Sequence, residues 1–250
     1  MRRRYTSEKK LFTERFYPGG TYTWIVPEGC TEVDVFLVGA GGGAGFQRAY
    51  GPSGGGGGGY TKTFKSSTDG WRDGNSIKVS PGQSIQVIVG SGVSGEDGGY
   101  SQFMNSNYRA EGGKAGKGWD NAGNGGSGGG GTDHTSFSSG DGGSDGSNGQ
   151  GGLRGKGQGH TTRDFGEPNG KRNSGGGSSI WWYENSPSKP KGGVSDYTEG
   201  TPDRRENYID VGESGFPGGG YGGGAAPDVR STYVKGGDGT VLIRYYAYEK

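Results

Sequence analysis

Residues 33–45 read VDVFLVGAGGGAG, and the first question is whether this stretch is a strand that leads into a dinucleotide-binding turn. Its first half is rich in β-branched and aromatic residues, which predicts a largely buried strand. Gly39, Gly41 and Ala44 then follow at the G-x-G-x-x-A spacing of a dinucleotide-binding turn. That turn requires a helix directly after it, because the pyrophosphate binds at the helix N-terminus. The chain continues instead as FQRAYGPSGGGGGG. Glycine costs about 1 kcal/mol relative to alanine at each helical position, so the sequence argues against a nucleotide-binding fold.

The composition indicates an ordered protein with an unusual backbone. Glycine accounts for 63 of the 250 residues, roughly four times its average usage, and only 26% of the residues are hydrophobic. A net charge of +1 and a content of 15 Tyr, 9 Phe and 5 Trp nevertheless oppose disorder, since disordered chains are highly charged and poor in aromatics. The near-neutral balance also argues against a nucleic-acid partner, which normally requires clustered Lys and Arg.

Cys30 is the only cysteine, so the sequence excludes an intramolecular disulfide and a cysteine metal cluster. No run of about 18 apolar residues is present. The basic start MRRRYTSEKKLF lacks the apolar core of a secretory signal. We therefore expect the chain to be made in a cytoplasm and to leave it, if at all, by a route other than a cleaved leader.

Short strand-like segments cluster at the two ends of the chain, separated by turn signals such as Pro27-Glu28-Gly29 and Pro81-Gly82. Because no helical stretch lies between them, they predict an antiparallel sandwich or barrel. The predicted strands are 11–17, 21–26, 31–38, 59–65, 76–80, 84–90, 100–104 and 239–248.

The last predicted strand, 239–248, is far from the others in sequence but needs a partner, because an isolated strand exposes unpaired backbone groups. Pairing with the N-terminal strands would bring together the two ends of the long middle region. We therefore predict an all-β fold in three parts. These are an N-terminal arm over 1–10, an antiparallel β-sandwich made of 11–104 plus 239–250, and a glycine-rich insertion over 105–238.

Three structures compete for the insertion and for the glycine run at 51–59. A flexible linker is the usual interpretation of Gly/Ser-rich sequence, but the insertion is long, contains aromatic residues and is framed by strands that must meet. Collagen requires an unbroken G-x-y register with abundant proline, and the chain has only 10 prolines and no such register. The third structure is a bundle of polyglycine-II helices, with three residues per turn. Backbones without side chains could approach closely enough to hydrogen-bond laterally, at a net gain of about 0.5–1.5 kcal/mol per bond, if the sandwich holds their ends.

Several motifs in a fixed order point to a known family. TYTWIVPEGCTEVDVFLVGAGGGAG, GGGGGGYTKTF, PGQSIQVIVGSGV, YSQF and GGDGTVLIRYY resemble the glycine-rich domains of phage tail and tail-fibre proteins, over residues 20–103 and 236–246. The resemblance implies a jelly-roll-like β-domain that carries polyglycine-II helices. The expected architecture is also similar to that of polyglycine-bundle adhesins at tail-fibre tips, whose loops between glycine helices contact the receptor. No catalytic residue and no cofactor come with either resemblance.

The segments that interrupt the glycine runs are rich in aromatic, His, Asn, Asp and Arg side chains, which is typical of recognition surfaces on a scaffold. Trp181, Trp182 and Tyr183 form either a sugar- or protein-binding platform or a local mini-core. In an extended segment the two tryptophans point in opposite directions, so only one would be available to a ligand. The lone Phe residues could equally anchor loops, and the histidines could be solvated. The receptor-binding candidates are Trp181, Trp182, Tyr183, Phe165, Phe137, Trp119, His160, His134, Phe46 and Tyr50.

The sequence carries no motif for metal binding or catalysis that we can read. GDGGSDGSNGQGG at 140–152 is similar to calcium-binding glycine–aspartate repeats, but it lacks their nine-residue period and supplies only Asp141 and Asp145 as carboxylates. A nucleophile elbow, a P-loop and paired carboxylates at a readable spacing are all missing. We therefore predict a protein that is not an enzyme and needs no metal or cofactor.

Two functions stay open from the sequence. The first is a tail-fibre or adhesin component of a virion whose loops bind a host-cell receptor, either a glycan or an outer-membrane protein. The second is a structural virion or tail decoration protein whose loops contact only the particle. In both cases the expected partners are other tail or fibre proteins and a homotrimer would suit a fibre. A solvated arm or an attachment peptide is expected at Arg2, Arg3, Arg4 and Tyr5.

Overall fold

The structure is a computed structural model, and it describes residues 8–44, 56–68, 72–116, 122–126, 128–129, 221–222, 224–225 and 235–249. Within these residues all regular elements are β-strands, and no helix is present. In chain order the strands are β1 (Lys9–Phe16), β2 (Gly20–Ile25), β3 (Glu32–Val38), β4 (Thr61–Phe64), β5 (Ile77–Lys78), β6 (Ser84–Val89), β7 (Ser101–Phe103), β8 (Arg109–Ala110) and β9 (Thr240–Tyr248).

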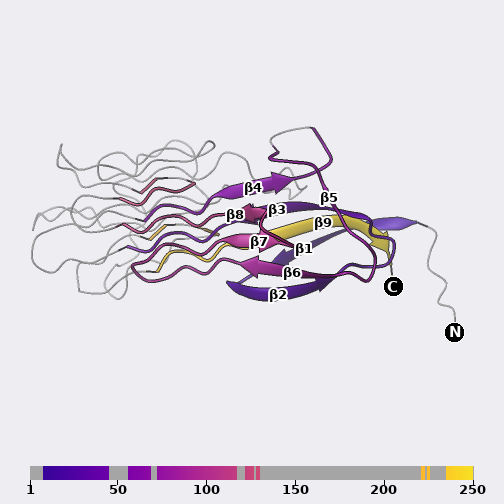
Figure 1. Ribbon diagram of the computed structural model, residues 1–250, viewed down its shortest axis with the longest axis horizontal. Coiled ribbons are helices and arrows are strands. Elements are labelled where there is room, and N and C mark those ends of the chain that lie inside the picture. Colours follow the sequence, from indigo (N-terminus) through magenta and orange to yellow (C-terminus); the bar gives the residue numbers. More distant parts are fainter. Residues whose placement is uncertain are drawn as a thin grey trace, which may run out of the picture.

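Five strands form the first sheet, in the order β1-β9-β3-β4, with β5 paired to the start of β3 (Figure 1). All of these pairs are antiparallel. The C-terminal strand β9 lies between β1 and β3, which confirms the prediction that it pairs with N-terminal strands. Val38 at the end of β3 pairs with Thr240 at the start of β9. The chain therefore leaves this sheet directly beside the residue at which it returns.

Four strands form the second sheet, in the order β2-β6-β7-β8, and these pairs are also antiparallel. The predicted turn at 80–83 closes with a bond from the N–H of Gln83 to the carbonyl of Ser80, at 3.0 Å. Pro81 and Gly82 occupy its central positions, and Gly82 has a φ of 80°, which is the geometry that a type II turn requires of its third residue. The same arrangement recurs in the turn at 27–30, where the third residue has a φ of 82°.

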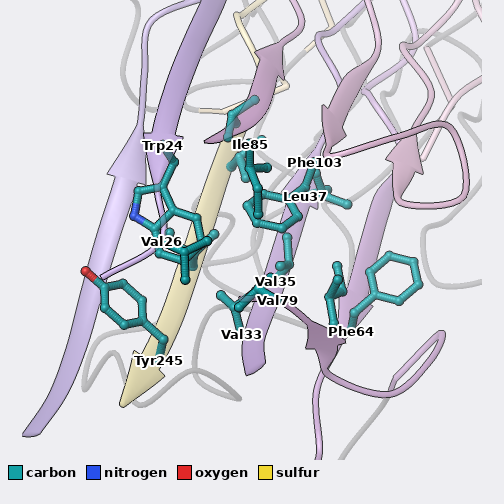
Figure 2. Packing of buried hydrophobic residues seen from close by; sticks show 14 of the residues in the cluster. Trp24, Val26, Val33, Val35, Leu37, Phe64, Val79, Ile85, Phe103 and Tyr245 are labelled. Carbon is teal, nitrogen blue, oxygen red and sulfur yellow. The ribbon is translucent and has the colours of Figure 1, made fainter. Parts of the chain in front are cut away.

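A single hydrophobic core lies between the two sheets (Figure 2). Val33, Val35 and Leu37 alternate along β3 and face this core, against Trp24 of β2 and Phe103 of β7. Because successive strand residues point to opposite faces, the other residues of β3 lie on the outer face of the sheet. Two of them, with a residue of β9, form a second buried cluster that Tyr221 covers: Phe36, Val38 and Leu242. Burial on both faces explains why this strand reads as a nearly continuous apolar run.

The eight predicted strands are all confirmed, with ends that shift by a few residues. The short strand β8 was not predicted, and it lies inside the segment that the sequence assigns to the insertion. Strand β1 begins at Lys9, inside the segment assigned to the N-terminal arm. The described glycine-rich segments continue from one end of the sandwich, and the first and last described residues lie at the other end (Figure 1).

Candidate functional site

Glycine-rich segments extend the strands at one end of the sandwich, and they lie side by side without forming regular strands (Figure 1). Several of them continue a strand in sequence: 39–44 follows β3, 56–60 precedes β4, and 235–239 precedes β9. We call this group the glycine bundle. Its described residues are 39–44, 56–60, 90–99, 111–116, 122–126, 128–129, 221–222, 224–225 and 235–239.

Backbone hydrogen bonds connect segment 39–43 to three neighbours in turn. Its first and fourth N–H groups donate to segment 56–60, at N···O distances of 2.9 and 2.8 Å. Its second and fifth donate to segment 96–99, at 2.9 and 2.8 Å. Its third donates to segment 235–239, at 2.9 Å. The donors of this segment therefore repeat every three residues, whereas the residues of a β-strand alternate with a period of two.

Segment 56–60 shows the same three-residue repeat. Its first and fourth N–H groups donate to the segment at 222–225, both at 2.8 Å. Its second and fifth donate to segment 111–116, both at 2.9 Å. The carbonyls of its second and fifth residues accept the bonds from segment 39–43, at 2.8 and 2.9 Å. Each backbone is thus bonded to several neighbours arranged around it, rather than to two neighbours in one plane.

Close approach of these backbones requires glycine at particular positions. A Cβ added to Gly42 would lie 2.0 Å from the carbonyl oxygen of Lys114, and one added to Gly59 would lie 1.9 Å from the carbonyl oxygen of Gly39. Carbon atoms normally approach other heavy atoms no closer than about 3.5 Å. A few alanines do fit into the bundle, and Ala40 and Ala44 are fully buried there. Absence of a side chain is therefore a packing requirement at specific positions and not along the whole segment.

The side chain of Asp238 ties the bundle to the sandwich. Its carboxylate accepts the N–H of Gly92 at 2.9 Å and the N–H of Gly19 at 3.2 Å, and it pairs with Lys235 Nζ at 2.9 Å. Burial by itself raises the pKa of this carboxyl, but the hydrogen bonds from Lys235 and from the two backbone N–H groups outweigh burial and hold the pKa below its usual value. A single ionised side chain thus connects the β1–β2 turn with two segments of the bundle.

Two further side chains satisfy backbone groups, one within the bundle and one at its junction with the sandwich. The carboxylate of Asp97 accepts the N–H of Ala115 at 2.9 Å and pairs with Lys114 Nζ at 2.8 Å. That hydrogen bond raises the pKa of Lys114. The fully buried hydroxyl of Ser101 donates to the carbonyl of Val38 at 2.6 Å and accepts the N–H of Gly90 at 3.0 Å. The two Ser101 bonds fix the positions from which segments 39–44 and 90–99 leave the two sheets.

Comparison with known protein families agrees with this geometry. A family model described as a glycine-rich domain matches residues 17–246, which include all of the glycine bundle and strands β2 to β8, but not β1 or the last two residues of β9. The chain belongs to this family. No curated protein matches the chain.

In this glycine-rich domain the predicted receptor-binding and attachment residues all lie outside the described residues. The described bundle nevertheless shows where their segments begin and end. Phe46 and Tyr50 lie between residues 44 and 56, and Trp119 lies between 116 and 122. The other candidates lie between residues 129 and 221: Phe137, His134, His160, Phe165, Trp181, Trp182 and Tyr183. The attachment candidates precede the described residues: Arg2, Arg3, Arg4 and Tyr5.

The edge of the sandwich contains a cavity of about 340 Å³ between β1, β2 and β9. Four aromatic rings border it, and one carboxylate reaches it from β1. In the adjoining aromatic cluster the ring centroids of Phe12 and Tyr245 are 5.7 Å apart, and those of Trp24 and Tyr245 are 5.1 Å apart. The lining includes Phe12, Glu14, Trp24, Ile25, Tyr245 and Tyr248.

The Tyr245 hydroxyl connects two polar groups of this cavity. It donates a short hydrogen bond to the carboxylate of Glu14 and is also hydrogen-bonded to the side chain of Trp24. Burial, followed by the bond to Glu14 and the negative charge of that residue, raises the pKa of Tyr245 far above its usual value. The tyrosine therefore stays protonated over the physiological pH range and acts as a donor toward Glu14.

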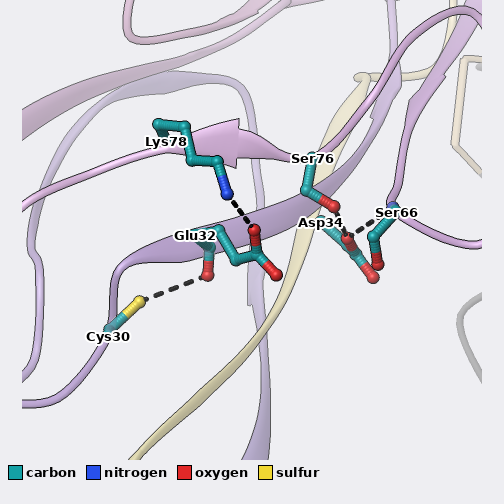
Figure 3. A network of polar contacts seen from close by, with 6 residues as sticks. All are labelled: Cys30, Glu32, Asp34, Ser66, Ser76 and Lys78. Carbon is teal, nitrogen blue, oxygen red and sulfur yellow. Dashed lines mark hydrogen bonds and ion pairs between the residues drawn. The ribbon is translucent and has the colours of Figure 1, made fainter.

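Other polar clusters of the sandwich have structural roles (Figure 3). The carboxylate of Asp34 on β3 accepts bonds from the N–H of Ser66 and the hydroxyl of Ser76, which ties the 65–76 connection to the sheet. The Cys30 thiol is buried, burial raises its pKa, and it donates to the carbonyl of Glu32 at 3.5 Å, so the sulfur stays protonated and unreactive. In the part of the chain that the structure describes, no group of three potential metal ligands comes together. No helix in that part is long and apolar enough to cross a membrane.

Sequence reasoning missed the residues that build the junction and the cavity. Asp238 is the acid in the motif GGDGT, and a carboxylate flanked by glycines beside a terminal strand is a signal for backbone contacts. Glu14 stands between Phe12 and Phe16, which both pack against the core. A carboxylate at an inward position of an alternating strand is the signal that could have located the cavity.

Proposed function

We propose that this glycine-rich domain is a tail or tail-fibre component of a phage virion that presents loops to a host-cell receptor. The glycine bundle carries the proposal. We interpret it as an array of polyglycine-II helices, and the three-residue repeat of hydrogen bonds in 39–43 and 56–60 supports that interpretation. The sandwich is interpreted as a jelly-roll-like base, on the strength of the motifs that resemble tail proteins.

The bundle is suited to hold loops in fixed relative positions. Ordering glycine costs roughly 0.5–1 kcal/mol more than ordering alanine, so an isolated glycine segment would not persist. Lateral bonds to several neighbours offset this cost at about 0.5–1.5 kcal/mol each, and strands of the sandwich hold one end of the segments 39–44, 56–60 and 235–239. Loops that connect such segments would present their side chains from a pre-organised frame, which lowers the entropic cost of binding.

Position within the bundle supports a recognition role for the connecting segments. Residues 44 and 225 meet in one buried contact, and the N–H of residue 56 donates to the carbonyl of residue 225 at 2.8 Å. Gly116 bonds to Gly43 at 3.0 Å, so it lies at the same level of the bundle. The segments that contain Phe46, Tyr50 and Trp119 therefore start from neighbouring points of the bundle, away from the sandwich. The segment that contains the other candidates ends at Tyr221, which packs on the outer face of the first sheet. The proposed receptor is a glycan or an outer-membrane protein, and the proposed site of the protein is the virion, with a homotrimer as one arrangement.

Binding to cells tests this function directly. Fluorescently labelled full-length protein is expected to bind saturably to cells of some strains in a panel of bacteria, and lipopolysaccharide or outer-membrane vesicles from those strains should compete. Alanine at Trp181, Trp182 or Phe165 should reduce binding, whereas the matched outer-face variant Lys78→Gln should not. If the aromatic substitutions abolish particle assembly and leave adsorption unchanged, the structural virion role replaces receptor binding.

A further inference from the structure

The cavity at the edge of the sandwich contains a carboxylate that forms no ion pair with another of the described residues. Phe12 and Phe16 on either side of Glu14 pack against the core, so Glu14 points inward from an edge strand. Within the described residues its only partner is the hydroxyl of Tyr245, which is a neutral donor. The second acid of the cavity, Glu249, is already paired with Lys10. A half-buried carboxylate without a cation loses part of its hydration and gains little in return.

The surroundings of Glu14 match the chemistry of a cation. The faces of aromatic rings carry partial negative charge and attract ammonium and guanidinium groups within about 6 Å. Lys9 already uses this attraction outside the cavity, where its Nζ lies 5.7 Å from the centre of the Tyr248 ring. The rings of Phe12, Trp24 and Tyr245 form an apolar wall, and the carboxylate lies at one end of it. A long aliphatic stem that ends in a positive charge would satisfy both parts of the cavity.

The position of the cavity makes it accessible to a polypeptide. β1 and β2 are the edge strands of their sheets, so a second chain can approach between them. Ile25 at the rim is 56% exposed, which gives a partner an apolar contact beside the opening. The volume of about 340 Å³ is at the lower end of the range for ligand pockets, and it suits one long side chain better than a large ligand.

We propose that the cavity binds a single lysine or arginine side chain of a partner polypeptide, through the carboxylate of Glu14 and the rings of Phe12 and Trp24. The stem of the bound side chain packs along the rings, and its charged group pairs with the carboxylate of Glu14. The site is independent of receptor binding by the loops, because it is built from β1, β2 and β9 and from residues that directly follow β2 and β9.

The test is an NMR titration of the full-length protein with n-butylammonium and n-butylguanidinium, followed at the indole N–H of Trp24, which Trp24→Phe assigns. Both cations are expected to bind saturably. Neutral 1-butanol, which has the same stem, should bind at least about five-fold more weakly, because only the cations pair with the carboxylate. Glu14→Gln keeps an acceptor for Tyr245 but removes the charge, and it should weaken cation binding at least about five-fold.

Two matched variants separate the site from general effects. Glu32→Gln removes an outer-face carboxylate that pairs with Lys78, and it should leave binding unchanged (Figure 3). Phe12→Leu keeps the apolar volume and the charge but removes one ring, so it should weaken binding about two-fold or more without loss of folding. Phe12→Leu also provides the test if Glu14→Gln fails to fold.

Three results would overturn the proposal. The first is equal affinity for 1-butanol and the cations, which would make the cavity merely apolar. The second is saturable binding of methyl glucoside with none of the cations, which would make it a sugar site. The third is unchanged cation binding by Glu14→Gln together with new self-association. In that case the inward charge of Glu14 would serve to prevent another chain from pairing with the edge strand β1.

Discussion

Alanine at Gly42 tests whether the glycine bundle is close-packed. The added Cβ would lie 2.0 Å from the carbonyl oxygen of Lys114, at least about 1 Å short of van der Waals contact. The obstructing atoms all belong to the backbone of Lys114 and Ala115, so segments 39–44 and 111–116 must separate. Separation would break the two bonds that join these segments, from the N–H of Gly113 to the carbonyl of Ala40 at 2.9 Å and from the N–H of Gly116 to the carbonyl of Gly43 at 3.0 Å.

The expected cost of this substitution follows from the two lost bonds. A buried backbone group without a partner costs about 1–3 kcal/mol, so the loss is about 2–6 kcal/mol. Replacing glycine by alanine also restricts the unfolded chain, which stabilises the folded state by about 0.4–1 kcal/mol. We therefore expect Gly42→Ala to reduce the free energy of unfolding by about 2–5 kcal/mol, out of the roughly 5–15 kcal/mol typical of a folded domain.

Urea denaturation followed by circular dichroism measures the global effect, and amide hydrogen exchange at 39–43 and 56–60 measures a local one. The matched control is Gly82→Ala, where no atom lies within 4 Å of the added Cβ but the φ of +80° is unfavourable. This control should lose only about 1–2 kcal/mol and leave exchange in the bundle unchanged. The reasoning would be refuted if Gly42→Ala were neutral or stabilising and its amides stayed protected. Position 42 would then tolerate a side chain, as a position in a flexible linker does.

Two further substitutions address the junction between bundle and sandwich. Asp238→Asn should lower the free energy of unfolding by about 1–3 kcal/mol at pH 7, because the ion pair with Lys235 is lost and one backbone N–H faces an amide donor. Folding lowers the pKa of Asp238 from 3.8. The charge of Asp238 therefore contributes to the free energy of unfolding above that pH, and this contribution is lost as pH falls through the pKa of the folded state. The difference between variant and native protein should therefore shrink in urea titrations at pH 3, and an equal difference at both pH values would contradict the role of this charge. Ser101→Ala should cost roughly 2–4 kcal/mol in the same assay, because it orphans a buried donor and a buried acceptor. The exposed serine Ser84 on β6 is the control, and a loss for Ser101→Ala within about 0.5 kcal/mol of Ser84→Ala would be inconsistent with the proposed bonds.

The sandwich was predictable because its signals are local. Alternating apolar residues mark the inward face of a strand, and Pro81-Gly82 fits only a turn whose third residue takes a positive φ. An isolated strand exposes unpaired backbone groups and needs partners, and this argument correctly placed β9 beside the N-terminal strands. The candidate loops were read from composition alone, and their role stays a prediction. The cavity escaped notice because Glu14 and Tyr245 are far apart in sequence and meet only through the pairing of β1 with β9.

The sequence by itself determined that this chain forms antiparallel sheets and that its glycines serve a purpose other than a nucleotide site, since strand periodicity and helix propensity are properties of short segments. Tertiary structure alone decided which glycine segments are neighbours. Glycine has no side chain to specify a register, so the order of the strands that each segment continues sets its neighbours. Side chains such as Asp238 then lock that arrangement, through contacts between residues that lie more than a hundred positions apart in the chain.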